Sequence, residues 1–263
     1  MTWLHRLTDR LALRPTTHAI VPDSLQRETI PADEGHIEAW TTETNPDLDP
    51  KVVVIKFIGN GGRAERSTAQ PASLWNNTHA KVWSINPFGY GGSSGTATLQ
   101  RFPEMVDAVY NHIRNRFPDL KIVVFGNSIG SISALRMAAK HPVDGLCIRN
   151  PVPLHQLLSR RPKYALPTLG LSNVLAWQIP QELNAVKNAR AINAPALFVT
   201  LTDDRTIPPR FQAEIIDVYA GEKNVFSVPG DHDAFIPEPM HDQYRAAVNW
   251  LLQKVLKSET NLS

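Results

Sequence analysis

The chain has a single cysteine, Cys147, and therefore cannot form an internal disulfide. It contains no apolar run of membrane-spanning length, and its net charge is only +2. No basic stripe with interleaved aromatic residues is present, so nucleic acid is not an expected partner. The first residues lack the uninterrupted apolar core of a secretory signal. Together these absences predict a cytoplasmic globular protein without disulfides.

What the chain does contain fits one α/β domain over residues 1–263. A chain of this length can bury a complete core. Short apolar or β-branched runs alternate with helical patterns, which predicts a mostly parallel, doubly wound sheet covered by helices. Residues 28–31 and 36–42 predict a peripheral antiparallel hairpin. The expected strands are 51–58, 81–85, 122–125, 143–148, 196–201 and 225–228, and the expected helices are 64–78, 102–117, 132–140, 182–191, 209–219 and 239–257.

The most informative stretch is 121–131, Lys-Ile-Val-Val-Phe-Gly-Asn-Ser-Ile-Gly-Ser. A strand pattern, then Gly-x-Ser-x-Gly, then a helical pattern is the context of a nucleophile elbow. Gly126 and Gly130 would allow a sharp turn and close packing of the helix. Ser128 would then lie at a helix N-terminus, where free N–H groups favour developing negative charge. The alternative is a serine that caps the helix in an ordinary strand-to-helix turn.

A nucleophilic serine needs a base and an orienting carboxylate, and the later strands supply candidates for both. His232 follows the strand 225–228 in a Gly-Asp-His-Asp turn, and its alternative role is to cap the last helix. Asp203 and Asp204 both follow the strand 196–201. A carboxylate at either position could bond one ring nitrogen of His232. The doublet is ambiguous, because one aspartate could merely cap the helix that begins near Pro208.

A glycine-rich loop, Gly59-Asn60-Gly61-Gly62, follows the first core strand. Glycines there would let backbone N–H groups approach a substrate oxygen. One such N–H, together with that of Ile129 after the serine, would form an oxyanion hole. The alternative is a glycine-rich turn without a chemical role.

These motifs resemble those of the alpha/beta-hydrolase superfamily, within it the serine esterase and aminopeptidase-like branch, from about residue 51 to 252. The order Ser, Asp, His is that of the family. The segment 86–95 is similar to the family's Gly-Tyr-Gly-x-Ser segment. Asp204-Arg205-Thr206-Ile207-Pro208 resembles its Asp-x-x-Val-Pro stretch. This resemblance favours Asp204 over Asp203 as the acid.

The resemblance also covers the glycine-rich loop. The segment 57–62 resembles the family's His-Gly-Asn-Gly-Gly, which implies that Asn60 supplies the second oxyanion N–H. Two positions depart from the family pattern. Ile58 replaces the histidine that usually braces the loop, and Asn127 stands where the family often has His or Gln.

Residues 150–181 are too long for an ordinary connection between a strand and a helix. They are rich in proline and leucine without clear regularity, and their prolines prevent one continuous helix. In the family that the chain resembles, insertions at this place form a cap over the nucleophile. We therefore expect an apolar cap that lines an acyl pocket, with Trp177 as a substrate-binding residue. The alternative is that these side chains pack on the sheet or on a second copy and touch no substrate.

The N-terminal segment 3–13 places Trp3, Leu4, Leu7 and Leu11 at helical spacing among arginines. This pattern is compatible with a weak membrane-surface contact, and packing on its own domain is the alternative.

The sequence predicts a hydrolase of carboxylic esters or thioesters that acts on a small acyl ester through Ser128, Asp204 and His232. The resemblance implies no metal or organic cofactor. An aminopeptidase or amidase of the same fold is the alternative enzyme, and a non-catalytic binding protein is the alternative of another class. The sequence does not determine the oligomeric state.

Overall fold

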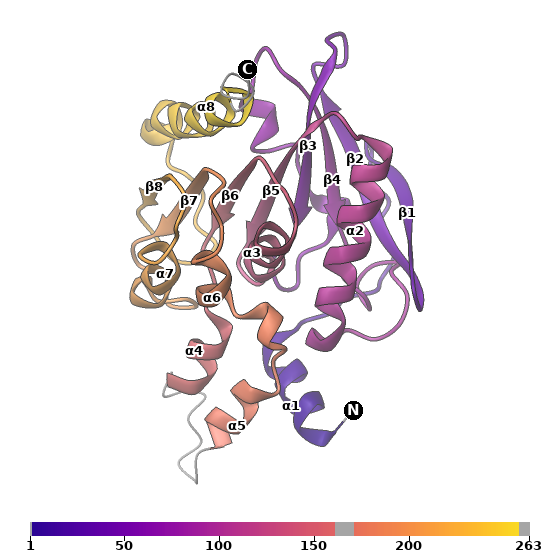
Figure 1. Cartoon of the computed structure of the whole chain (residues 1–263), viewed down its shortest axis with the longest axis vertical. Coiled ribbons are helices and arrows are strands. Elements are labelled where there is room, and N and C mark those ends of the chain that lie inside the picture. The colour runs from indigo at the N-terminus through magenta and orange to yellow at the C-terminus, as the bar shows by residue number, and fades with distance from the viewer. Residues whose placement is uncertain (1, 161–170, 258–263) are drawn as a thin grey trace.

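A computed structural model describes residues 2–160 and 171–257. Its centre is an eight-stranded sheet in the order β1-β2-β4-β3-β5-β6-β7-β8 (Figure 1). β1 pairs antiparallel with β2, and β2 pairs antiparallel with β4, while all other neighbouring pairs are parallel. The strands are β1 (Gln26–Ala32), β2 (Gly35–Thr44), β3 (Pro50–Phe57), β4 (His79–Ile85), β5 (Lys121–Asn127), β6 (Gly145–Arg149), β7 (Ala196–Leu201) and β8 (Lys223–Val228). The predicted α/β class, the parallel core and the peripheral hairpin are confirmed.

Helices cover both faces of this sheet (Figure 1). They are α1 (Trp3–Ala12), α2 (Phe102–Arg116), α3 (Gly130–Lys140), α4 (Leu154–Arg160), α5 (Leu171–Trp177), α6 (Ala185–Ala189), α7 (Pro209–Ile216) and α8 (His241–Lys257). Short 3-10 turns at Ala64–Arg66, Ala72–Leu74, Leu99–Arg101, Gln181–Leu183 and Glu238–Met240 complete the connections.

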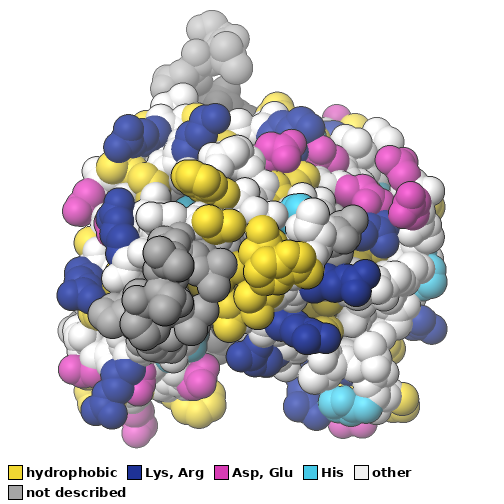
Figure 2. All heavy atoms as spheres, turned by 90° about the horizontal axis from the view of Figure 1, so that it is seen from below, with side chains coloured by type: hydrophobic (Ala, Val, Ile, Leu, Met, Phe, Trp, Pro, Cys, Tyr) yellow, Lys and Arg dark blue, Asp and Glu magenta, His cyan; other side chains and the backbone are white. Residues whose placement is uncertain are grey.

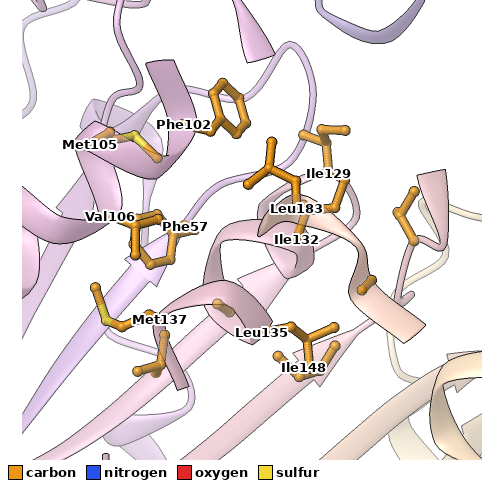
Figure 3. Close-up of a cluster of buried hydrophobic side chains, with 14 of the residues drawn as sticks. Phe57, Phe102, Met105, Val106, Ile129, Ile132, Leu135, Met137, Ile148 and Leu183 are labelled. Carbon is orange, nitrogen blue, oxygen red and sulfur yellow. The ribbon is translucent and has the colours of Figure 1, made fainter. Parts of the chain in front are cut away.

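The strand residues divide between the two faces with the expected period of two. Val53, Ile55 and Phe57 of β3 belong to the core beneath α2 and α3. Figure 3 shows Phe57 within this core, close to Val106 of α2. Val52 and Val54 of β3 face the opposite way and pack in the core that α8 covers. Because both faces are buried, the central strands read as continuous apolar runs.

The helix predicted over 64–78 is wrong. The chain forms two 3-10 turns, Ala64–Arg66 and Ala72–Leu74, with irregular backbone between them. Proline disfavours the helical conformation at the residue before it and has no N–H to donate, so Pro71 prevents a continuous helix. The buried Lys56 also donates to the carbonyl oxygen of Thr68 at 2.5 Å, which fixes this segment in a non-helical path.

Residues 150–181 have no clear regularity in sequence, and their prolines exclude one continuous helix; where the structure describes them, two short helices form, α4 and α5. In α4, Leu154, Leu157 and Leu158 recur at helical spacing and are buried. The part of the predicted cap at 161–170 lies outside the described residues. Over residues 2–160 and 171–257, no helix is long and apolar enough to cross a membrane.

Candidate active site

Ser128 lies in a sharp turn between β5 and α3, as the elbow motif predicts. Its φ is +51°, in the left-handed region that non-glycine residues rarely adopt. A Cβ on Gly126 would lie 2.7 Å from the Cα of Ser131, and one on Gly130 would lie 2.2 Å from the carbonyl oxygen of Phe57. Glycine is therefore required at both positions for α3 to pack against the sheet. This tight packing holds Ser128 in its strained conformation.

The parallel sheet brings Ser128, His232 and Asp204 together at one edge. Ser128 Oγ lies 3.0 Å from His232 Nε2, and His232 Nδ1 lies 2.7 Å from Asp204 Oδ2. Since a carboxylate only accepts hydrogen bonds, Nδ1 carries the proton and Nε2 is left to accept from the serine hydroxyl. This is the arrangement that a serine nucleophile needs.

The two aspartates of the doublet have different surroundings. Asp204 is only 2% exposed. Besides the His232 bond, its carboxylate accepts from the N–H of Ile207 at 2.6 Å and from the amide of Gln212 at 3.1 Å. Asp203 is exposed, and it accepts from the N–H of Gly230 at 3.1 Å instead. The structure thus places Asp204, and not Asp203, against the histidine.

Asn60 and Ile129 both line the cavity at Ser128. Among the described residues, neither backbone N–H has an acceptor. The Asn60 side chain is fixed at both ends, since its amide donates to the carbonyl oxygen of Ala12 at 2.9 Å and its Oδ1 accepts from Tyr90 Oη at 3.2 Å. Tyr90 is buried, and burial raises the pKa of its hydroxyl to about 12. Two backbone N–H groups without an acceptor among the described residues therefore belong to residues that line the cavity at Ser128.

Position 58 is an isoleucine and not a bracing histidine. A buried polar network supports the glycine-rich loop. Arg63 pairs with Glu65, and Asn86 donates to Glu65 at 2.9 Å and to Glu38 at 2.7 Å. Asn86 also accepts from the N–H of Ala64 at 2.9 Å. These bonds connect the loop after β3 to the ends of β2 and β4.

Glu38 keeps its charge within this network. Burial opposes that charge, but hydrogen bonds from the N–H of Gly92 and the amide of Asn86 outweigh it, and the pKa of Glu38 is held below its usual value. Sequence reasoning missed the network, because its members lie on three separate segments without a common motif.

The cavity at Ser128 has a volume of about 290 Å³. Its polar side carries His232, Asn60, Asn127, Thr206 and Asp233. Its apolar side comes from α1, α4 and nearby loops, through Leu11, Ala12, Ile129, Val152, Leu154, Leu157, Leu158 and Ile207. The sequence did not predict that α1 would contribute to this wall.

Trp177 does not line this cavity. It ends α5 with 74% of its surface exposed. The neighbouring Leu175, Ala176 and Ile179 are the side chains of this segment that are buried, so the indole is on the outward side of α5. Leu154, Leu157 and Leu158 of α4 line the cavity at Ser128, and Trp177 does not.

Comparison with known proteins gives a consistent result for the fold. A family model described as alpha/beta hydrolase fold matches residues 59–176. An uncharacterized protein of Mycobacterium tuberculosis is 22% identical over 220 residues, which is 82% of this chain and 74% of the relative.

Solved structures give the same result. The Pyrococcus furiosus esterase Pf2001 has a TM-score of 0.69 at 16% identity, over 92% of this chain and 97% of the esterase. The acylaminoacyl peptidase of Pyrococcus horikoshii has a TM-score of 0.68 at 14% identity, over 95% of this chain and 46% of the peptidase. XC6422 of Xanthomonas campestris, an α/β serine hydrolase without lid, has a TM-score of 0.59 at 14% identity, over 90% of this chain and 97% of that one. The sheet order, the family-model match over residues 59–176 and these likenesses together show that the chain has the alpha/beta hydrolase fold.

Proposed function

We propose that this protein is a serine hydrolase that cleaves carboxylic esters or thioesters through an acyl-enzyme. The observation that carries the proposal is the continuous hydrogen-bonded series Ser128–His232–Asp204, with distances of 3.0 and 2.7 Å, at a cavity with two free backbone N–H groups. A serine that merely capped α3 would not need a histidine and a buried carboxylate aligned behind it.

In the proposed reaction, Ser128 Oγ attacks the acyl carbonyl carbon while His232 Nε2 takes the hydroxyl proton. Asp204 keeps the ring oriented and stabilises the imidazolium that forms. The N–H groups of Asn60 and Ile129 donate to the oxyanion of the tetrahedral intermediate. His232 then gives its proton to the departing alcohol or thiol. Water, activated by the same histidine, cleaves the acyl-enzyme.

The cavity favours a short to medium acyl chain. Its volume of about 290 Å³ is near the lower end of the ~300–1,000 Å³ that small-molecule sites occupy. The leucines of α4 offer apolar contacts on one side of it. We propose that this part of residues 150–181 acts as the acyl-binding cap, with Leu157 and Leu158 in the substrate-binding role.

An aminopeptidase is the second candidate, and Asp233 is the observation in its favour. This acidic residue is exposed and lines the cavity beside His232, where it could bind a substrate ammonium group. The similarity in fold to an acylaminoacyl peptidase is compatible with this candidate. The apolar side of the cavity favours the ester hydrolase.

A fluorophosphonate probe tests the proposal directly, because only an activated serine labels quickly. We expect rapid labelling of the parent protein at Ser128 and none in Ser128→Ala, with turnover of nitrophenyl esters lost in the same variant. In subtilisin, loss of the serine costs about a millionfold in kcat. An unlabelled parent, or a Ser128→Ala variant that retains ester hydrolysis, would contradict the proposal. Amino-acid anilides cleaved faster than any nitrophenyl ester would favour the aminopeptidase instead.

A further inference from the structure

The helix α1 separates two cavities. Leu11 and Ala12 face the cavity at Ser128. On the other side, α1 and residues 96–98 line a second cavity of about 580 Å³, which no step of the proposed reaction uses. Two arginines, Arg6 and Arg10, line this second cavity one helical turn apart.

The guanidinium groups of these two arginines are exposed and have no partner within the described part of the chain. Both side chains are exposed, and neither guanidinium has an acidic partner or a hydrogen-bond acceptor among residues 2–160 and 171–257. The one acid on the cavity wall is Asp9, whose Oδ1 already accepts from the N–H of Leu99 at 2.9 Å. The cavity therefore carries an excess of positive charge. Guanidinium groups are well suited to phosphate, because their planar N–H donors match two oxygens at once.

Two exposed tryptophans lie on the same helices. Trp3 at the start of α1 is 66% exposed, and Trp177 at the end of α5 is 74% exposed. The two helices contact each other, and the hydroxyl of Thr8 donates to the carbonyl oxygen of Leu175 at 3.3 Å. Figure 2, which looks at this end of the molecule, shows hydrophobic side chains gathered beside Lys and Arg side chains. Exposed tryptophan beside arginine is the composition of helices that lie in a membrane interface.

We propose that the face formed by α1 and α5 binds the surface of an anionic lipid bilayer. Arg6 and Arg10 bind lipid phosphates, and Trp3 and Trp177 lie at the level of the headgroups. The positive charge of the arginines and the exposed indoles on the same two helices complement an anionic lipid surface.

This inference does not rest on the proposed hydrolase activity, and its test does not measure turnover. The full chain is floated with vesicles of phosphatidylcholine, with or without a minority of phosphatidylglycerol, at low and high salt. We expect binding to the anionic vesicles and little to the neutral ones, with a decrease at high salt. Ser128→Ala should bind as the parent does, which separates this proposal from the catalytic one.

Two sets of variants test the residues. Arg6→Gln with Arg10→Gln should lower the partition coefficient on the order of thirtyfold, since each arginine near an anionic surface contributes roughly a factor of five. The matched control, Lys51→Gln with Arg245→Gln, removes the same charge from exposed positions on β3 and α8, away from α1 and α5 (Figure 1). It should change the partition little. Trp3→Ser should weaken the binding that persists at high salt.

Four outcomes would overturn the inference. Equal partition of the parent protein onto neutral and anionic vesicles would remove the role of charge, as would a control pair that loses as much binding as the Arg6 and Arg10 pair. Binding of inorganic phosphate without binding of vesicles would make the second cavity a site for a soluble anion. A dimer that dissociates on Trp3→Ser, again without vesicle binding, would make this face an interface between two copies of the chain.

Discussion

Asp204 and His232 are 28 residues apart in the chain and share a 2.7 Å hydrogen bond, because β7 and β8 are parallel neighbours that end at the same edge of the sheet. The same edge holds the ends of β3 and β5, where Phe57 pairs in register with Gly126. The glycine-rich loop and the elbow must then continue side by side. The candidate site is thus a consequence of strand order and register.

The aspartate doublet gives the first prediction. Asp204→Asn should lower kcat for a nitrophenyl ester by on the order of ten-thousandfold, the cost that the same change has in trypsin, because an amide stabilises the wrong tautomer of the histidine. Asp203→Asn is the matched control, and it should cost little because its carboxylate accepts from the N–H of Gly230 and the hydroxyl of Thr202 and not from His232. Both variants should be purified and compared by steady-state kinetics. A larger loss in Asp203→Asn would transfer the acid role to that residue.

Tyr90 gives the second prediction, as a positioning residue for the proposed oxyanion donor. Tyr90→Phe removes the bond from the hydroxyl to Asn60 Oδ1 and lets the glycine-rich loop shift. We expect kcat to fall about tenfold with KM nearly unchanged, since an oxyanion donor acts mainly in the transition state. Tyr110→Phe is the control, because its hydroxyl also bonds a carbonyl, that of Pro142, away from the cavity. Equal losses of kcat in the two variants would mean that Tyr90 contributes only to the stability of the fold.

These residues also mark how far the sequence can predict the structure. The strand-turn-helix context located Ser128, because the glycines that permit the elbow are local to it. His232 and Asp204 were predictable in outline, since parallel strands deliver their ends to one edge. The network of Glu38, Glu65 and Asn86 was not predictable, because it depends on how β2, the turn Ala64–Arg66 and the end of β4 come together.

The same reason explains two places where the structure differs from what the sequence suggests. Nothing in the local sequence shows which side of α5 faces inward, and packing against α1 and α4 turns Trp177 outward. The segment 64–78 has a composition compatible with a helix, yet Pro71 and the bond from Lys56 to Thr68 prevent one. Tertiary contacts decided both cases, and local propensity did not.

Lys56 gives the third prediction, on stability and pH. Burial lowers the pKa of its ammonium group to about 8, against roughly 10.4 in an unfolded chain. The folded state therefore binds fewer protons than the unfolded state between these values, and the parent protein gains stability as pH rises from 8 to 10. Below pH 8 the ammonium group is charged in the folded protein, and the full cost of burying that charge, about 3 kcal/mol, is present.

Lys56→Met removes the cost of burying the ammonium group and also the hydrogen bond to Thr68. The comparison therefore uses the change of the free energy of unfolding with pH and not its absolute value. Urea unfolding at a series of pH values from 7 to 10 should show the variant's free energy of unfolding falling relative to that of the parent as pH rises. A difference that stays constant across this range would mean that Lys56 has an ordinary pKa in the folded protein.

The last prediction concerns the acyl chain. For the parent protein, kcat/KM should rise from acetyl to medium-chain nitrophenyl esters, because each buried methylene contributes roughly 0.8 kcal/mol, about a fourfold change. The rise should stop early, because the cavity of about 290 Å³ is small. Leu158→Ala removes part of the apolar wall, so the medium-chain esters should lose more than the acetate does. Trp177→Ala should leave the slope unchanged, because the indole is outside the cavity.

Thermal unfolding of Leu158→Ala must show a folded protein at the assay temperature, since truncating a buried leucine costs about 2–5 kcal/mol. If Trp177→Ala flattened the series and Leu158→Ala did not, the acyl chain would lie along α5, as the sequence alone predicts. A preference for acetate in the parent would instead favour the aminopeptidase candidate, in which Asp233 binds the substrate's amino group.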